Sequence, residues 1–473
     1  MDVQMKKQDV NRYFPLFIYV FCFIISVVVL WQGRSFGLFP MPSPGMDQLN
    51  FLDHAQNMLK GILPDYSYKL SFSYTVFLAF LSLITGGEIL IMRILQIALC
   101  SLIPVVIYKL CRLLRCSFIA SQIAALLYCF YGTSILVSIG FLRAAPLALC
   151  FIGFVYLLVK GFYSKKYHHY LCAGLLAGLA ILGRENFIPI ALAPLIMLFF
   201  PVVRKHVSGQ KIAIYLVGIF ILIAPLIMYN YIRFDAPELI PGNFTHIFKF
   251  YHGEKTVESS GKLANSIINR VPSQVKMFAS SYEAPNSLAL YAHREIISLL
   301  NVLRVPFNLI LAMAILALFL DFKHLRSLFI GGMATGYFLT IIYFSMFYRF
   351  RVVDVPLLLV LCGIAIRSLM QTKSRKLIYS FSAIFVILFF FMTYTHPNKI
   401  RTGSERRSVI GLLISNKDYY RAEKLIDGLI EDEVPLNNIE KHLVKEIYNE
   451  GYKEDAKRLF TKYNENIPSI KQQ

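Results

Sequence analysis

Long runs of apolar residues, separated by short polar or basic stretches, fill the first 397 residues of the chain. A helix that crosses a membrane needs about 20 predominantly apolar residues. The runs predict spans at about 14–31, 89–109, 117–138, 144–160, 170–184, 187–202, 212–230, 304–320, 327–346, 353–369 and 377–394. A further run, Tyr74 to Thr85, is only about a dozen residues long, so we interpret it as re-entrant or interfacial. The pattern predicts an all-α polytopic membrane protein with about 11 transmembrane helices.

Composition supports this class. Hydrophobic residues make up 56% of the 473 residues and charged residues 16%, whereas soluble proteins carry about 25% charged residues. The formal charge of +20 would suggest nucleic acid as a partner in a soluble protein. In a membrane protein, the positions of the basic residues relative to the spans explain much of this charge. Loops on the side of the N-terminus hold 18 Lys and Arg against three acidic residues, Asp2, Asp9 and Asp321. The positive-inside rule then places the N-terminus in the cytoplasm, so membrane lipids are expected partners and nucleic acid is not.

The same topology places three segments on the outer face. These are the first outer loop at about 32–88, a second outer loop at about 231–303, and a C-terminal tail at 398–473. The second loop contains the lone sequon at Asn243. The eight cysteines lie in apolar runs or at their basic ends, which suggests neither a disulfide framework nor a metal site. No cofactor is expected, and a divalent metal ion is left open.

The tail differs from the membrane domain (1–397) because it is charged and has helical periodicity. Its segment 416–426 aligns with 450–460 at an offset of 34 residues, which is the period of a tetratricopeptide repeat. Ala422 and Ala456 are the small residues expected where paired helices touch. The tail is therefore predicted to be a soluble helical, tetratricopeptide-like domain, with a plain helical hairpin as the alternative.

Asp47 begins an amphipathic stretch in the first outer loop. Leu49, Leu52 and Leu59 share one helical face, and Gly61 fits a helix stop. In one interpretation Asp47 is simply the N-cap of this helix. In the other it is a carboxylate held at the boundary of lipid and water, available as a general base.

The order of these features resembles the GT-C glycosyltransferases. It is most similar to the bacterial relatives of dolichyl-phosphate-mannose protein mannosyltransferases and of the lipid A aminoarabinose transferase. The resemblance covers roughly 14–394 and rests on the following segments: Asp47, the helix with Phe51, Ala55 and Gly61, the run from Ser73 to Leu78, Gly87-Glu88 with Arg93, Gly183-Arg184-Glu185-Asn186, and Tyr348 to Pro356. It implies a GT-C-like helical bundle in a bacterial inner membrane.

The resemblance also implies a chemistry. Such an enzyme transfers a sugar from a polyprenyl-phosphate carrier to an acceptor on the outer face, with inversion, and Asp47 corresponds to the acidic residue that deprotonates the acceptor. The leaving lipid phosphate needs fixed positive charge. The candidates, all in or near the outer halves of spans, are Arg93, Arg143, Arg184, Arg349 and Arg351. Possible assisting residues are Asp53, Glu185 and Tyr348.

Each arginine also has a structural interpretation. It can snorkel toward the interface, or pair locally, as Arg184 with Glu185 or Arg351 with Asp354. The chain departs from many relatives by having Arg143 where they have an acidic residue, and its outer loops lack a DxD pair. Two other functions remain alternatives: a transporter or flippase for a lipid-linked or small solute, and an enzyme similar to an O-antigen ligase or polymerase. The sugar and the acceptor, whether protein, lipid or glycan, are not specified.

Overall fold

The structure is a computed structural model, and it describes most of the membrane domain and much of the tail. The described residues are 2–35, 39, 47–62, 71–164, 166–196, 208–234, 260–283, 290, 293–294, 297–322, 324–342, 348–372, 375–393, 407, 410–411, 413–414, 417–431, 436 and 438–465. The sequon at Asn243 and about half of the second outer loop, including 235–259, lie outside these residues.

The described part of the chain is helical, with no β-strand beyond one isolated bridge between Tyr131 and Arg304. The predicted all-α class is confirmed. The first half contains α1 (Asp2–Ser35), α2 (Asp47–Leu59), α3 (Phe72–Thr85), α4 (Ile89–Cys100), α5 (Leu102–Leu113), α6 (Phe118–Phe130), α7 (Gly132–Ile139), α8 (Ala144–Ser164), α9 (Tyr167–Gly183), the 3-10 helix η2 (Glu185–Phe187), α10 (Ile188–Ile196) and α12 (Gly209–Phe234). The second half contains α15 (Ser260–Ala279), η4 (Ser298–Asn301), α17 (Phe307–Leu320), α18 (Leu325–Ile341), α19 (Tyr348–Gln371) and α20 (Arg375–Thr393).

Each of the eleven predicted spans overlaps one of these helices or a consecutive pair, and residues 197–202, 343–346 and 394 of the predicted spans lie outside the described residues. Five segments are long and apolar enough to cross a membrane: 12–35, 89–113, 144–164, 209–232 and 349–371. Five shorter apolar helices are α3, α6, α9, α17 and α18. These helices support an integral membrane protein, while the number of crossings and the sidedness stay predictions.

The predicted span at 117–138 is divided at Tyr131 into α6 and α7. Gly132 at this break lies against the backbone of Leu303, where an added Cβ would come within 2.7 Å of the carbonyl oxygen. The absence of a side chain at Gly132 therefore allows the segment before α17 to approach the break closely. This contact brings residues far apart in the sequence together near the start of α17.

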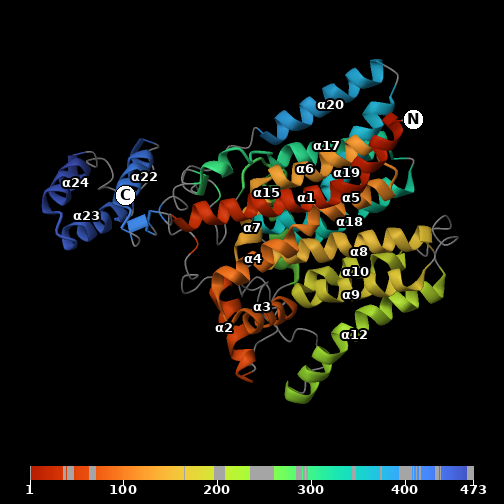
Figure 1. Ribbon diagram of the computed structural model, residues 1–473, viewed down its shortest axis with the longest axis horizontal. Helices are drawn as coiled ribbons and strands as arrows, with labels where there is room; N and C mark the ends of the chain where they lie inside the picture. The colour runs from red at the N-terminus through yellow and green to blue at the C-terminus, as the bar shows by residue number, and fades with distance from the viewer. Residues whose placement is uncertain are drawn as a thin grey trace.

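Helix α19 is the central element of the bundle (Figure 1). Within its apolar window 83% of the residues are buried inside the protein, and it packs against α5, α6, α8, α17 and α18. A helix that is apolar on nearly all sides is expected at such a position, because it has no face that needs to meet water. The first turn of α19 carries Arg349 and Arg351. The packing of α19 in the core therefore fixes the backbone positions of both residues.

Helices α2 and α3 form a small cluster beside this core. Helix α2 begins at Asp47, as predicted. Its buried face is formed by Phe51, Leu52 and Ala55, whereas Leu59 near its end is 45% exposed. The larger ring at Phe51 determines the orientation, since it meets the Tyr74 ring edge-on at 5.2 Å.

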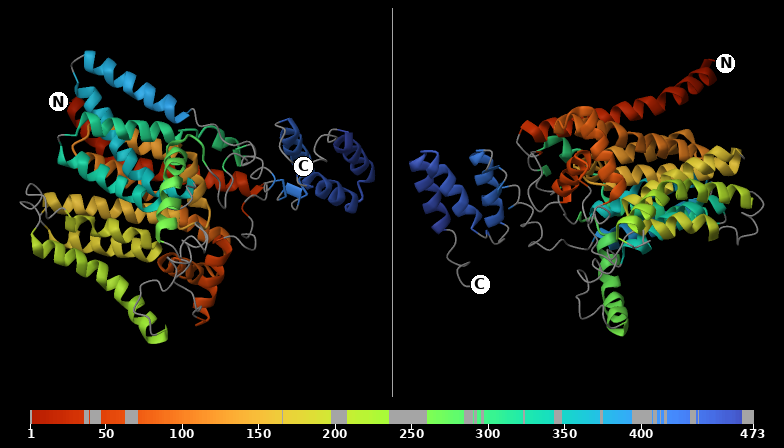
Figure 2. Two further views of the ribbon diagram at one scale, coloured as in Figure 1. Left: turned by 180° about the vertical axis from the view of Figure 1, so that it is seen from behind. Right: turned by 90° about the horizontal axis from the view of Figure 1, so that it is seen from below.

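The tail contains α22 (Tyr419–Glu431), α23 (Ile439–Asn449) and α24 (Lys453–Glu465), which lie to one side of the bundle (Figures 1 and 2). Helices α22 and α24 begin 34 residues apart, as the internal alignment requires. They are joined by Glu423, which accepts from Arg458 at 3.1 Å and from Lys462 at 2.8 Å. The tail is helical as predicted, and its kinship with tetratricopeptide repeats stays a prediction.

Candidate active site

Asp47 and Arg349 meet although 302 residues separate them in the sequence. Nη1 of Arg349 lies 2.5 Å from Oδ2 of Asp47. The Asp47 side chain is 40% exposed and that of Arg349 is 16% exposed, so the pair sits at the edge of the protein interior. Asp47 is in the first turn of α2, where a carboxylate is favoured by the helix dipole. A candidate base and a candidate phosphate ligand are thus in direct contact.

Arg143 and Arg184 join Arg349 around one cavity. The cavity is small, with free space of about 10 Å³, and it is also lined by Phe51 of α2 and Phe350 of α19. Arg143 interacts electrostatically with the other two arginines and with Asp47. Three guanidinium groups lie near two carboxylates here, Asp47 and Glu185, and the remaining excess of positive charge is suited to a phosphate.

Phe350 lies between two of these arginines. The Cζ atom of Arg184 is 4.1 Å from the centre of the Phe350 ring, and that of Arg349 is 5.2 Å away. Guanidinium groups at these distances are attracted by the ring face. The ring therefore holds like charges close together without neutralising them, and it leaves their charge available for an anion.

Backbone packing positions Arg143 and Arg184. Arg143 donates to the carbonyl oxygen of Gly183 at 3.2 Å. Gly183 ends α9 in a tight space, because an added Cβ would approach Leu147 to 2.5 Å and Ser73 to 3.0 Å. The end of α9 can thus press against α3 and α8 only because residue 183 has no side chain. Arg184 follows immediately, and its own side chain is buried, with 9% exposed.

Gln96 is a buried residue that sequence reasoning missed. Its amide nitrogen donates to the carbonyl oxygens of Ser138 at 2.8 Å and Gly140 at 2.6 Å. Its amide oxygen accepts from Tyr74 at 2.8 Å. Gln96 thereby fixes the turn that carries Arg143 to the cavity. A glutamine inside an apolar run was the available signal, because polar residues within membrane helices are costly and often functional.

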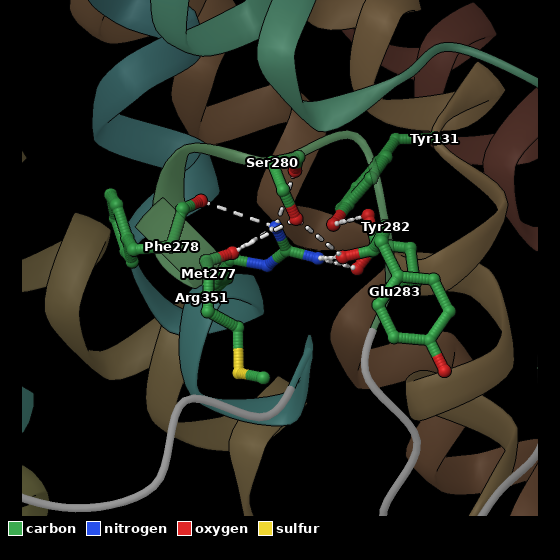
Figure 3. A network of polar contacts seen from close by, with 7 residues as sticks. All are labelled: Tyr131, Met277, Phe278, Ser280, Tyr282, Glu283 and Arg351. Atoms are coloured by element: carbon green, nitrogen blue, oxygen red, sulfur yellow. Dashed lines mark hydrogen bonds and ion pairs between the residues drawn. The ribbon is translucent and has the colours of Figure 1, made fainter. Parts of the chain in front are cut away.

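Arg351 lies outside the cavity, in a buried network with the end of α15 (Figure 3). Its Nη2 meets Oε2 of Glu283 at 2.6 Å, and Tyr131 donates to the other oxygen of Glu283 at 2.7 Å. The guanidinium also donates to backbone carbonyl oxygens of Met277, Phe278, Ser280 and Tyr282. These partners occupy both Nη atoms, so Arg351 holds 277–283 against α19. Its ion-pair partner is Glu283, not the Asp354 suggested by the sequence.

Arg93 also lies apart from the cavity-lining residues. It is 3% exposed and sits over two rings, with its Cζ atom 5.0 Å from the centre of Phe141 and 5.5 Å from that of Phe39. This environment indicates a packing role on α4. Of the five predicted arginines, the structure brings together Arg143, Arg184 and Arg349.

The possible assisting residues have different positions. Asp53 is exposed on α2. Glu185 is half-buried in η2 and interacts electrostatically with Arg143. Tyr348 is the first residue of α19, and its side chain is outside the described part of the structure. Among the described residues, no group of three or more His, Cys, Asp and Glu side chains is placed to hold a metal ion.

Comparison with known proteins supports the resemblance seen in the sequence. The family model of dolichyl-phosphate-mannose-protein mannosyltransferase matches residues 71–229. The similarity to this family thus extends over a stretch that contains Arg93, Arg143 and Arg184, but neither Asp47 nor Arg349. This match supports a membrane glycosyltransferase.

Among solved structures, the archaeal oligosaccharyltransferase AglB from Archaeoglobus fulgidus, in complex with an inhibitory peptide and a dolichol-phosphate, is similar with a TM-score of 0.48 and 14% identity. The similarity covers 87% of this chain and 59% of that chain, so the protein described here spans little more than half of the archaeal enzyme. The comparison with curated proteins gave no match.

Proposed function

We propose that the protein transfers a sugar from a polyprenyl-phosphate-linked donor to a nucleophilic acceptor, with inversion at the anomeric carbon. Asp47 is the general base, and Arg143, Arg184 and Arg349 bind the phosphate. The name of the matched family specifies dolichyl-phosphate-mannose, so a polyprenyl-phosphate-linked hexose is the first donor to test. The acceptor side of the reaction faces the outer surface of the membrane in the topology predicted from the sequence.

One observation carries this proposal: the contact of Asp47 with Arg349 next to Arg143 and Arg184. These residues come from four separate segments, namely the start of α2, the turn before α8, the turn after α9 and the start of α19. A helix cap requires only Asp47 and its own backbone. Convergence of three arginines on it is not needed for capping, and it supports an anion site beside a base.

The chemistry assigns each group one task. The acceptor attacks the anomeric carbon while Asp47 takes its proton. The bond from the anomeric carbon to the phosphate oxygen breaks, and its electron pair leaves with the lipid phosphate. The phosphate gains one negative charge in this step, so the fixed guanidinium groups stabilise the transition state more than the bound donor. No general acid is required, since the leaving phosphate is stable as an anion.

The donor must displace Arg349 from Asp47. While Oδ2 of Asp47 accepts from the guanidinium at 2.5 Å, this oxygen is occupied and cannot take a proton from the acceptor. The cavity itself has room of only about 10 Å³, far less than the roughly 300 to 1,000 Å³ of ligand pockets. A phosphate that takes over Arg349 would open this space and free Asp47 in the same event. The base therefore becomes available only when the donor is bound.

The test is release of polyprenyl phosphate from a lipid-linked hexose by the purified protein. Arg349→Gln, Arg143→Gln and Arg184→Gln should each lower kcat/KM by about 10² or more, in the range for loss of one preorganised donor. The matched control is Arg304→Gln, because Arg304 is exposed and bonds to Asn301. Wild-type rates in all three variants would refute the phosphate site. Movement of the donor across the membrane without phosphate release would instead support a flippase.

A further inference from the structure

A second hollow lies in the tail, far in sequence from the proposed active site. It is an open groove of about 650 Å³ between α23 and α24, which lie side by side in Figure 1. Side chains about one turn apart on each helix line it: Glu440, Val444 and Tyr448 from α23, and Ala456, Phe460 and Tyr463 from α24.

The internal repeat shows that part of this groove is an uncovered helix face. Helices α22 and α24 align at an offset of 34 residues, and their small residues, Ala422 and Ala456, are both buried. The next aligned pair differs: Ile426 is fully buried, whereas Phe460 is 58% exposed. In the first repeat unit, α22 packs against α23. The position of Phe460 on α24 therefore corresponds to one that is covered by a neighbouring helix in the first repeat unit. No described residue covers most of the Phe460 ring.

Positively charged side chains flank the apolar lining residues Val444, Ala456 and Phe460 on both helices. Lys441 and Lys445 are one turn apart on α23, and Lys453 and Lys457 are one turn apart on α24. The lining contains only two acidic residues, Glu440 and Glu454, so the groove carries a positive excess. Lysines on both walls favour an occupant with carboxylates along both edges.

Two buried polar atoms in the lining add a separate indication of a ligand. Oε2 of Glu440 and the hydroxyl of Tyr463 have no hydrogen-bond partner among the described residues. Glu440 is 8% exposed and Tyr463 is 2% exposed. Buried polar atoms are usually paired, and leaving them unpaired is costly. An occupant that supplies hydroxyl or amide groups at this point would satisfy both atoms.

We propose that this groove binds an amphipathic helix of a partner protein that carries acidic residues along its edges. The apolar face of the partner helix covers Phe460 in the same way that α23 packs against α22. The carboxylates of the partner helix pair with the lysines of the two walls. Recognition of a helix in a groove uses apolar anchors at i, i+3, i+4 and i+7, which matches the one-turn spacing of the lining. This inference is independent of the glycosyltransferase proposal.

The test uses the full chain in nanodiscs and a fluorescein-labelled 18-residue peptide with leucine on one helical face and glutamate elsewhere. Fluorescence anisotropy should show binding that weakens as salt is raised. The same peptide with lysine in place of glutamate should bind at least about tenfold more weakly. Absence of binding by the acidic peptide, or equal binding of both peptides, would overturn the proposal.

Variants locate the binding to the groove. Lys441→Glu with Lys445→Glu, and separately Phe460→Ala, should each weaken acidic-peptide binding by about tenfold or more. The matched controls are Lys424→Glu and Tyr420→Ala, because both residues are exposed on α22. Phosphate release should be unchanged in all of them. Equal losses in the controls, or a dimer in light scattering that Phe460→Ala dissolves, would show that the groove does not serve this partner.

Discussion

Replacing Arg351 by methionine removes a guanidinium whose side chain is 2% exposed and leaves its partners in place. The carboxylate of Glu283 would then stay buried, still accepting a hydrogen bond from Tyr131. Breaking a buried ion pair by removing one member costs about 3 to 5 kcal/mol. Methionine has a similar length and a flexible side chain, so it limits the loss of packing. We expect Arg351→Met to lower thermal stability clearly while the donor KM of the folded enzyme changes little.

Thermal unfolding followed with a thiol-reactive dye suits this protein, since Cys22, Cys100 and Cys129 are among six buried cysteines that unfolding would expose. The matched control is Arg304→Met, which removes an exposed guanidinium and should leave the midpoint unchanged. Adding Glu283→Gln to Arg351→Met should restore part of the loss, because a buried amide costs less than a buried carboxylate. An unfolding midpoint equal to that of the wild type, together with a strongly raised donor KM, would refute the structural role of Arg351 and return it to the phosphate site.

Three further predictions concern other parts of the chain. Gln96→Leu should lower kcat/KM by about tenfold or more in the phosphate-release assay, because the turn that carries Arg143 loses its two amide hydrogen bonds; unchanged kinetics would show that the turn holds without them. Asp321→Asn should destabilise the protein by about 3 to 5 kcal/mol, because its two buried or half-buried arginine partners would lose their carboxylate; an unchanged unfolding midpoint would contradict this. After replacement of the exposed native cysteine, a cysteine at Lys166 should be shielded from an impermeant thiol reagent in intact cells and one at Lys424 should react; the opposite pattern would overturn the predicted topology.

The pH dependence of Asp321 follows from its surroundings. Although burial raises its pKa, hydrogen bonds from Ser327 and Arg326 and the charge of Arg367 lower it overall. A lowered pKa in the folded state stabilises the protein above the unfolded pKa, near 3.9, and this stabilisation is lost as the pH falls through the folded pKa. The part of this contribution that comes from Ser327, Arg326 and Arg367 should therefore be constant from about pH 5 to 8.

The helices were predictable because apolar runs of the required length have few other uses in a chain. Asp47 and Arg349 were each predicted as site residues from their positions and from the family resemblance. Their pairing was not, because a contact between residues 302 apart depends on tertiary packing that no local pattern encodes. The break at Tyr131 was missed for the same reason, since it depends on the close approach of Leu303 to Gly132.

The different positions of Arg349 and Arg351 have a simple geometric cause. Residues two apart on an α-helix point about 200° away from each other. Both arginines lie in the first turn of α19, so once this turn is helical they cannot face the same cavity. The sequence assigned both to the phosphate because it did not fix where α19 begins. Gln96 and Glu283 were missed because their partners are mostly backbone carbonyls or residues remote in the sequence.

The central claim is that Asp47 is the general base of a glycosyl transfer, and one variant tests it most directly. Asp47 is the first residue of α2, where Asn keeps the shape of the side chain but loses the favourable interaction with the helix dipole, worth about 0.3 to 1 kcal/mol at an exposed site. Asp47→Asn should therefore change α2 and the unfolding midpoint little. It removes the proton acceptor and releases Arg349, so donor binding should be kept or strengthened while turnover falls by about 10² to 10⁴. Asp53→Asn, on the exposed face of the same helix, is the matched control and should retain most activity. Near wild-type release of polyprenyl phosphate by Asp47→Asn would contradict the account.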